Sequence, residues 1–173
     1  MRTALIFIMT MLLAGCSTVE IANETEGFRI DKEGRYVVFP FSDPPGGYRA
    51  VSGKGDNFRE IFMQHCAEYG VGLQPIYGKQ LRAGEKIDLE EAIKIAKKNK
   101  ANFMIFGKAT KWKTPNRIDG KLNTGLEVKI QGVYSKKIVF KAELVQKSSR
   151  YSDDSDRGII EDLSKEMALS ACR

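Results

Sequence analysis

Strict alternation of apolar and polar residues over 125–134 is the feature that most constrains how this chain can fold. Its apolar positions are Leu126, Val128 and Ile130, and its polar positions are Glu127, Lys129 and Gln131. A period of two places these two sets on opposite faces of a strand. A short turn at 135–137 then leads into a second strand-like run over 138–145. The two runs predict an antiparallel hairpin with one solvated face.

Three further runs of β-branched and aromatic residues predict strands earlier in the chain, over 35–41, 71–77 and 102–112. Pro75 cannot donate a backbone hydrogen bond, so the second of these strands is expected at an edge of the sheet.

Apolar residues at helical spacing predict helices over 57–69, 88–99 and 156–172, with Asp56 and Asp88 as the expected caps of the first two. The resulting order is β-α-β-α-β-β-β-α. It predicts the α/β class in its mixed α+β form, with a mixed sheet of about five strands and the helices packed against it.

The first residues form an export signal. An apolar run over 4–13 follows Arg2 and ends in Leu13-Ala14-Gly15-Cys16, the pattern of a secretory signal peptide. The run is too short for a membrane-spanning helix, which needs about 20 apolar residues. Cys16 directly after Leu-Ala-Gly closely resembles the bacterial lipobox. That resemblance implies cleavage before Cys16, a thiol carrying diacylglycerol and an acylated amine. The alternative is a secreted protein with an unrelated cysteine at this place.

We therefore divide the chain into a signal peptide (1–15), a lipidated acidic tether (16–34) and a periplasmic domain (35–173). The net charge is −3 over 17–34 and +8 from 35 onwards, and the whole chain carries +6. A basic domain favours anionic neighbours such as lipid headgroups, peptidoglycan carboxylates or an acidic protein, although scattered lysines also serve solubility. Ser17 stands where inner-membrane lipoproteins have aspartate, so the resemblance implies the periplasmic face of the outer membrane, with the inner membrane as the less favoured address.

Cys66 and Cys172 remain as a pair once Cys16 carries lipid. An exported protein lies in an oxidising compartment, where disulfides persist. A disulfide requires Cα atoms within about 7 Å of each other. Two free, packed thiols are the competing interpretation.

The residues expected for catalysis are missing from the sequence. His65 is the only histidine and lies on the apolar stripe of a predicted helix, and no Gly-x-Ser-x-Gly elbow occurs. The glycine-rich loop over 43–55 lacks the Walker pattern, because Tyr48 and Gly55 replace the required glycine and hydroxyl residue. We expect no enzyme, no metal and no cofactor. Nucleic acid is also excluded as a partner, because no recognition motif occurs.

Several segments together carry a resemblance to known proteins. They are the strand 36–41, the Gly70-Val71 turn, the Lys-Lys-Asn-Lys-Ala-Asn stretch that ends at Asn102, and Phe106-Gly107. In this order the chain resembles the small α/β domain of the amino-terminal part of TolB, the curli secretion channel lipoprotein and the Lpo-type lipoproteins. It is also similar to small proteobacterial lipoproteins of unknown function. The resemblance implies a binding or assembly module.

The leading hypothesis is a membrane-anchored, non-catalytic scaffold that docks an envelope protein or peptidoglycan. Its expected contact surface is Trp112 with Lys111, Lys113 and Arg117, since aromatic residues and arginine are enriched at interfaces. A tryptophan that covers the edge of the core is the alternative role for Trp112. The second hypothesis is a periplasmic binder of a small ligand or glycan that uses the loop over 43–55.

Overall fold

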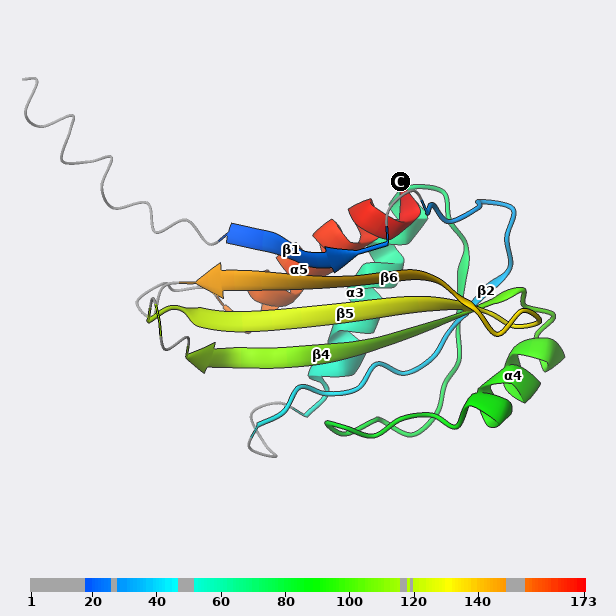
Figure 1. Cartoon of the computed structure of the whole chain (residues 1–173), viewed down its shortest axis with the longest axis horizontal. Coiled ribbons are helices and arrows are strands. Elements are labelled where there is room, and N and C mark those ends of the chain that lie inside the picture. Colours follow the sequence, from blue (N-terminus) through cyan, green and yellow to red (C-terminus); the bar gives the residue numbers. More distant parts are fainter. Residues whose placement is uncertain (1–17, 26–27, 47–51, 116–117, 119, 149–154) are drawn as a thin grey trace, which may run out of the picture.

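The computed structural model of the protein describes residues 18–25, 28–46, 52–115, 118, 120–148 and 155–173 (Figure 1). The strands are β1 (Thr18–Glu24), β2 (Tyr36–Val38), β3 (Leu73–Pro75), β4 (Phe103–Pro115), β5 (Leu122–Gly132) and β6 (Ile138–Ser148). The helices are α3 (Lys54–Glu68), α4 (Leu89–Lys98) and α5 (Asp156–Cys172). Among these helices, none is long and apolar enough to cross a membrane.

The strands form one mixed sheet in the order β1-β6-β5-β4-β2-β3. β2 runs parallel to both of its neighbours, and all other pairs are antiparallel. The predicted mixed α/β class is confirmed, as is the edge position of the strand that contains Pro75. The predicted hairpin is also confirmed, with Ile130 opposite Phe140 and with Leu126, Val128 and Ile130 fully buried.

The sheet has six strands because the predicted tether contains a strand. We expected no secondary structure over 16–34, and this is wrong for 18–24, where β1 pairs with β6 from Thr18↔Lys147 to Glu24↔Ala142. Further along, Ile30 is buried in the core, and its amide donates to the Ala171 carbonyl. The folded domain therefore begins at least as early as Thr18, not at residue 35.

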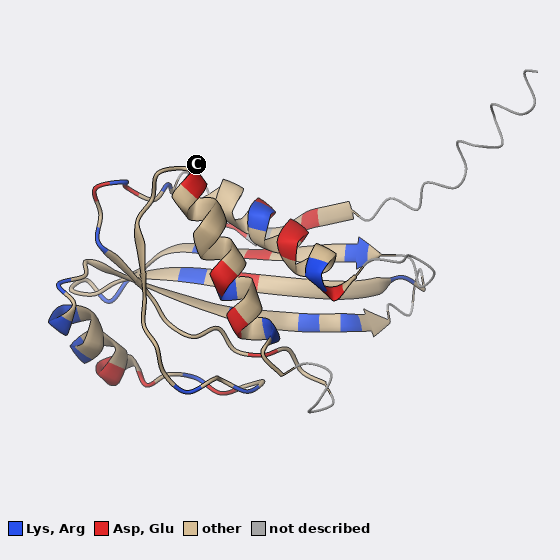
Figure 2. Cartoon of the chain, turned by 180° about the vertical axis from the view of Figure 1, so that it is seen from behind, with Lys and Arg blue, Asp and Glu red and all other residues tan. Residues whose placement is uncertain are grey.

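Two helices cover one face of the sheet and one helix covers part of the other. α3 and α5 lie side by side across the face seen from behind in Figure 2. Their apolar residues, such as Phe62 and Leu163, pack on Ile105, Val128 and Leu144. α4 packs on the opposite face through Ala92, Ile93 and Ala96, over the start of β4. None of the helices in the described residues covers the rest of that face of β4, β5 and β6 (Figure 1).

The start of α3 differs from the prediction. The helix begins at Lys54 with Gly53 as its N-cap, and Asp56 lies in its first turn. Gly53 adopts a φ of +80°, which favours glycine, and a Cβ on Gly55 would lie 2.3 Å from the Phe41 carbonyl oxygen. These two glycines let the helix begin against the end of the strand. Asp88 caps α4 as expected, since it accepts a hydrogen bond from the Glu91 amide. Ser155 caps α5 by accepting one from the Gly158 amide.

Candidate functional site

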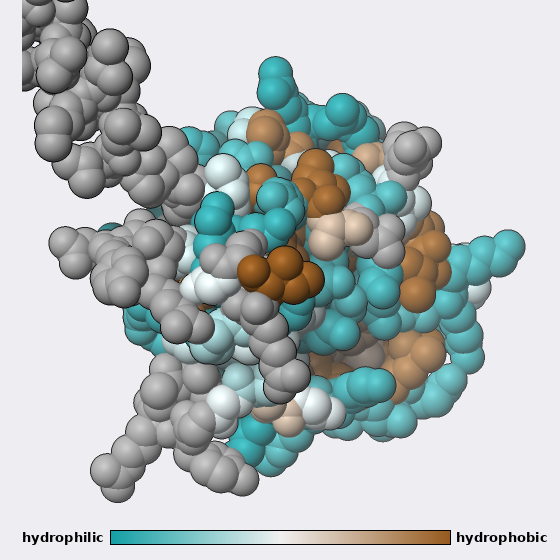
Figure 3. Space-filling model, turned by 60° about the vertical axis from the view of Figure 1, so that its left-hand side comes forward, coloured by the Kyte–Doolittle hydropathy of each residue, from teal (hydrophilic) through white to brown (hydrophobic). Residues whose placement is uncertain are grey.

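A cleft of about 840 Å³ lies on the open side of the sheet, between the strands β4 and β5, the segment 81–89 and the turn before β6. Its charged lining residues are Glu85, Lys86, Lys108, Glu127, Lys129, Lys136 and Lys137. Its apolar lining residues are Pro40, Leu81, Ile87, Leu89, Phe106 and Ile138. Hydrophobic areas bordered by hydrophilic ones are also visible over the surface in Figure 3. The cleft combines a net positive charge with apolar walls.

The outer wall of the cleft is attached to the sheet through backbone contacts. Ser42, which continues the line of β2, bridges to Leu81 on one side and to Lys108 on the other. The amide of Asp43 donates to the Leu81 carbonyl at 2.9 Å. Beyond Leu81, the Glu85 carboxylate accepts a hydrogen bond from the Arg82 amide at 2.9 Å, which lowers the pKa of Glu85. The segment is therefore held in place by its own turn and by the sheet.

An aromatic stack forms the floor of the cleft. Phe106 lies parallel to Phe39, with 5.1 Å between the ring centres. The ammonium group of Lys129 also lies over the Phe106 ring, 4.9 Å from its centre. Such a position is favourable for a cation, because the ring face carries negative charge density. Lys129 is therefore fixed at the centre of the cleft.

Burial is the largest influence on Lys129 and lowers the pKa of its ammonium group. Glu127 opposes this shift, whereas the nearby Lys86, Lys141 and Lys108 add to it. Several lysines therefore lie close to Lys129, and an anion bound among these positive charges would be stabilised.

Only part of the positive charge is neutralised within the protein. Glu127 pairs with both Lys108 (3.2 Å) and Lys141 (3.3 Å). Lys136 pairs with Glu90 of α4 at 2.9 Å. Among the described residues, no carboxylate pairs with Lys86, Lys129 or Lys137.

The predicted contact surface at the end of β4 is largely engaged in internal contacts. Trp112 is half-buried and lies edge-on to Phe58, and the Lys54 ammonium group lies 4.7 Å from the centre of one of its rings. This arrangement corresponds to the alternative role, a tryptophan at the edge of the core. Lys111 is exposed, and Arg117 lies outside the described residues.

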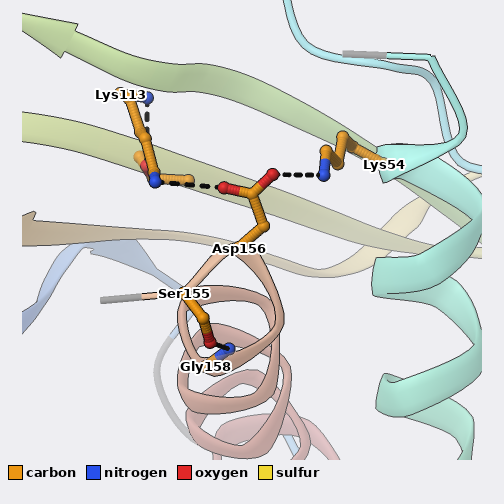
Figure 4. A network of polar contacts seen from close by, with 6 residues as sticks. Lys54, Lys113, Ser155, Asp156 and Gly158 are labelled. Carbon is orange, nitrogen blue, oxygen red and sulfur yellow. Dashed lines mark hydrogen bonds and ion pairs between the residues drawn. The ribbon is translucent and has the colours of Figure 1, made fainter. Parts of the chain in front are cut away.

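Lys113 belongs to an ion-pair network that joins three elements (Figure 4). The Asp156 carboxylate lies between Lys54 (2.6 Å) and Lys113 (3.0 Å), and these hydrogen bonds lower its pKa. Because Lys54 begins α3, Lys113 lies in β4 and Asp156 begins α5, the network connects both helices to the sheet.

The structure joins Cys66 of α3 and Cys172 of α5 by a disulfide, with 5.4 Å between their Cα atoms. On the same pair of helices, His65, which directly precedes Cys66, lies 3.0 Å from Glu68 and 2.8 Å from Glu161. Burial disfavours the charged imidazole, but the two carboxylates outweigh it and raise the pKa of His65. His65 therefore links α3 to α5.

The loop over 43–55 contributes to the start of α3. Asp43 is buried, and its carboxylate accepts hydrogen bonds from the amides of Gly53 (3.1 Å) and Gly55 (2.9 Å) and from the Gln80 side chain (2.9 Å). The carboxylate thus occupies the anion position at this helix N-terminus. Residues 47–51 of the loop, like Cys16, lie outside the described part. No group of three metal-ligating side chains occurs in the parts of the chain that the structure describes.

The cleft was not predicted from the sequence. The alternation over 125–134 does place Glu127, Lys129 and Gln131 on the face opposite the buried Leu126, Val128 and Ile130, and this is the one local signal for the cleft. That face was predicted to be solvated, but Gln131 is buried and Glu127 and Lys129 are only partly exposed, because the segment 81–89 lies over it. The segment that carries Lys86 and Ile87 has no periodicity that would place it opposite that face. The cleft arises from the topology, which brings residues more than forty positions apart together.

No family model matches the chain, and no curated protein matches it. Solved structures do share its fold. The PelC dodecamer from Paraburkholderia phytofirmans matches at a TM-score of 0.65 and 14% identity, over 91% of this chain and 100% of that chain. Lipoprotein GNA1162 from Neisseria meningitidis matches at 0.53 and 12% identity, over 79% of this chain and 96% of that chain.

The LpoB C-terminal domain from Salmonella enterica also matches, at a TM-score of 0.37 and 10% identity, over 70% of this chain and 86% of that chain. The predicted resemblance is confirmed at the level of the fold, which the chain shares with PelC and with the lipoprotein GNA1162.

Proposed function

We propose that the protein is a lipid-anchored lipoprotein of the bacterial envelope that binds a partner without catalysis, through the cleft between β4, β5 and the segment 81–89. The observation that carries the proposal is the basic, apolar-walled cleft on a fold shared with a bacterial lipoprotein. The lipobox-like Leu13-Ala14-Gly15-Cys16 supports the anchor. Lys111 at the end of β4 is a further proposed contact, because it is exposed there.

The anchor is tested by metabolic labelling of cells with an alkyne-tagged palmitate. We expect the protein to take up label and to fractionate with the outer membrane, and Cys16→Ser to abolish both. Thr18→Ser is the control, because it alters an exposed side chain two residues further on and leaves both Cys16 and the disulfide intact. A labelled protein in the inner membrane would correct the address alone, whereas an unlabelled wild-type protein would overturn the anchor.

Partner binding is tested by site-specific crosslinking in the envelope. A photo-crosslinking residue at Lys137, on the rim of the cleft, should give discrete adducts with a partner. The same residue at Lys165, which is exposed on α5 across the sheet, is the control and should give none. The absence of specific adducts from Lys137 and Lys111 alike would overturn the scaffold proposal.

A second candidate is the binding of a small ligand or glycan, and the cleft volume of about 840 Å³ favours it. The cleft replaces the loop over 43–55 as its proposed location. A thermal-shift screen with envelope metabolites and cell-wall fragments tests this candidate. The ligand-binding candidate requires a compound that raises the melting temperature of the wild type but not that of the Lys129→Gln variant.

Self-association is a further possibility within the scaffold role, because one solved structure with this fold is a dodecamer. Native mass spectrometry of the purified protein tests it directly. A ring-sized complex would support an assembled scaffold, and a monomer at all concentrations would restrict the proposal to a single-copy binder.

A further inference from the structure

We propose that the occupant of the cleft is an acidic peptide segment with interspersed apolar side chains, contributed by a partner protein. This inference rests on the proposed function and specifies the chemistry of the partner. Three properties of the cleft support it. They are the charge of its lining, its apolar walls and its position relative to the chain end that leads to Cys16.

The charge of the lining favours an anionic occupant. Five lysines and two glutamates line the cleft, a net charge of +3. Glu127 already pairs with two lysines, and Glu85 bonds to its own turn and to Lys79. Lys86, Lys129 and Lys137 are thus left to face the cleft with no carboxylate partner among the described residues. Opposite charge on a partner is the general way in which such a surface is recognised.

The walls favour an occupant that also carries apolar side chains. Ile138 is 53% exposed and Leu89 is 38% exposed, although both are large apolar residues. They lie at the rim of the cleft, with Ile87 and Phe106 further in. Apolar surface that alternates with lysines matches a peptide in which acidic and apolar side chains alternate.

The position of the cleft disfavours a lipid surface. The described chain begins at Thr18, which pairs with Lys147 at the far end of β6. Ile138, at the rim of the cleft, begins β6, and nine residues of strand separate it from Lys147, about 30 Å at 3.4 Å per residue. Cys16 lies two residues before Thr18, so a lipid at Cys16 would place the membrane at the end of the sheet away from the cleft.

The geometry disfavours an acidic glycan as well. Sugar rings stack on open aromatic faces, but the Phe106 ring is already stacked with Phe39 and in contact with the Lys129 ammonium group. The cleft offers ammonium donors and aliphatic walls instead. These groups suit carboxylates on a chain with aliphatic side chains.

The experiment measures fluorescence anisotropy of short labelled peptides with the purified lipoprotein in nonionic detergent. The main probe alternates glutamate and valine, and its two controls replace the glutamates by glutamine or the valines by serine. We expect the main probe to bind most tightly, each control at least about tenfold more weakly, and added salt to weaken binding, because ion pairs at a protein surface are screened.

Variants locate the site. The triple variant Lys86→Gln/Lys129→Gln/Lys137→Gln should weaken binding by at least about tenfold, since removal of a charge pair at an interface commonly costs that much or more. Ile138→Ser should weaken the binding of the main probe and leave the serine control peptide unaffected. Lys165→Gln removes one lysine charge on the opposite side of the sheet and should bind as the wild type does. Lys137→Glu should also weaken binding of the main probe. Because it alters one exposed side chain, this result does not depend on whether the triple variant folds.

A second readout is specific to the floor of the cleft. A bound carboxylate would raise the pKa of Lys129, which nuclear magnetic resonance of carbon-labelled lysine side chains measures directly. A probe that binds elsewhere would leave that pKa unchanged, and this result would overturn the proposed site.

Two further probes separate the alternatives. Vesicles of phosphatidylethanolamine and phosphatidylglycerol test a lipid surface, and oligogalacturonate tests an acidic glycan. Binding of either one through the cleft, with no peptide binding, would overturn the peptide inference while the proposed binding function survived. If no probe bound and neither Lys137 nor Lys111 gave crosslinks in the envelope, both the peptide inference and the proposed binding function would fail.

Discussion

The disulfide between Cys66 and Cys172 allows a prediction with a definite magnitude. It connects residues 106 positions apart and closes nearly two thirds of the chain into a loop. In the chain-entropy model, a loop of this length lowers the free energy of the folded state relative to the unfolded state by about 5 kcal/mol. Measured values often fall below the model, so we expect a contribution of about 3–5 kcal/mol.

Chemical reduction of the wild type is the cleanest perturbation, because it opens the bond and keeps both sulfur atoms in the core. Both cysteines are buried, so Cys66→Ala/Cys172→Ala also leaves a small cavity and should be slightly less stable than the reduced wild type. Urea unfolding followed by circular dichroism gives the free energy of unfolding of each form. The slope of that free energy against urea should also rise on reduction, since the unfolded chain exposes more surface.

Mass spectrometry after alkylation checks the premise. Protein from the envelope should show no free thiol at Cys66 or Cys172 before reduction and two after it. Two alkylated thiols without reduction would refute the disulfide. Oxidised and reduced forms with free energies of unfolding within about 1 kcal/mol would instead refute the entropy argument.

Three further perturbations have expected outcomes. The pKa of His65 is raised in the folded protein, so its pairs with the glutamates stabilise the fold fully below the unfolded pKa of 6.5. This stabilisation is lost as pH rises through the folded pKa. His65→Gln should therefore reduce the free energy of unfolding more at pH 6 than at pH 9. The pKa of Asp156 is lowered, so its contribution to stability depends on pH in the opposite direction. This contribution is present above the unfolded carboxyl pKa of 3.8 and is lost as pH falls through the folded pKa. Asp156→Asn should therefore cost about 1 kcal/mol at pH 7, a modest value because the carboxylate is half-exposed, and nothing near pH 2. Gly107→Ala should cost about 1–3 kcal/mol, since the added Cβ would lie 2.4 Å from the buried Phe41 ring. Urea unfolding at the stated pH measures each effect, and an unchanged midpoint would contradict it.

The strands and helices with strong local patterns could be predicted from the sequence. The hairpin of β5 and β6 is specified by the period of two, and α4 by its apolar stripe and the Asp88 cap. The strand β1 could not be predicted, because its side chains carry little local signal: Val19 packs on the core and Glu20 pairs with Lys147, but there is no sustained apolar run. Ile21, one of its apolar residues, is 61% exposed, and the strand is held by backbone hydrogen bonds to β6, more than a hundred residues away.

The same difference between local sequence patterns and long-range contacts explains why only part of the cleft could be predicted from the sequence. The face that carries Lys129 follows from the alternation of β5, but the wall opposite to it does not. That wall is fixed by the bridge between Ser42 and Leu81 and by the turn at Glu85. Trp112 at the end of β4 was predicted as a contact residue because aromatic residues are common at interfaces, yet Phe58 and Lys54 cover it in the fold. A residue type can indicate a surface only when the packing around it is also known.

The strand β1 changes the geometry expected for a lipid anchor at Cys16. A free tether over 16–34 would let the domain reach far from the membrane, whereas Thr18 already pairs with Lys147 in the sheet. Two residues of chain span at most about 7 Å, so the Thr18 end of the sheet should lie close to the bilayer. The cleft, about 30 Å away along β6, should face the periplasm.

This orientation can be measured on the lipidated protein in vesicles that carry an acceptor dye on their headgroups. A fluorescent unnatural residue is placed at Thr18 or at Lys137, both of which are exposed. We expect strong energy transfer from Thr18 and weak transfer from Lys137, because the two positions lie at opposite ends of the sheet. A flexible glycine-serine linker inserted after Ser17 should reduce the difference, since it restores the freedom that β1 removes. Equal transfer from both positions without the linker would mean that the domain lies flat on the bilayer, and a cleft that faces the periplasm would then be wrong.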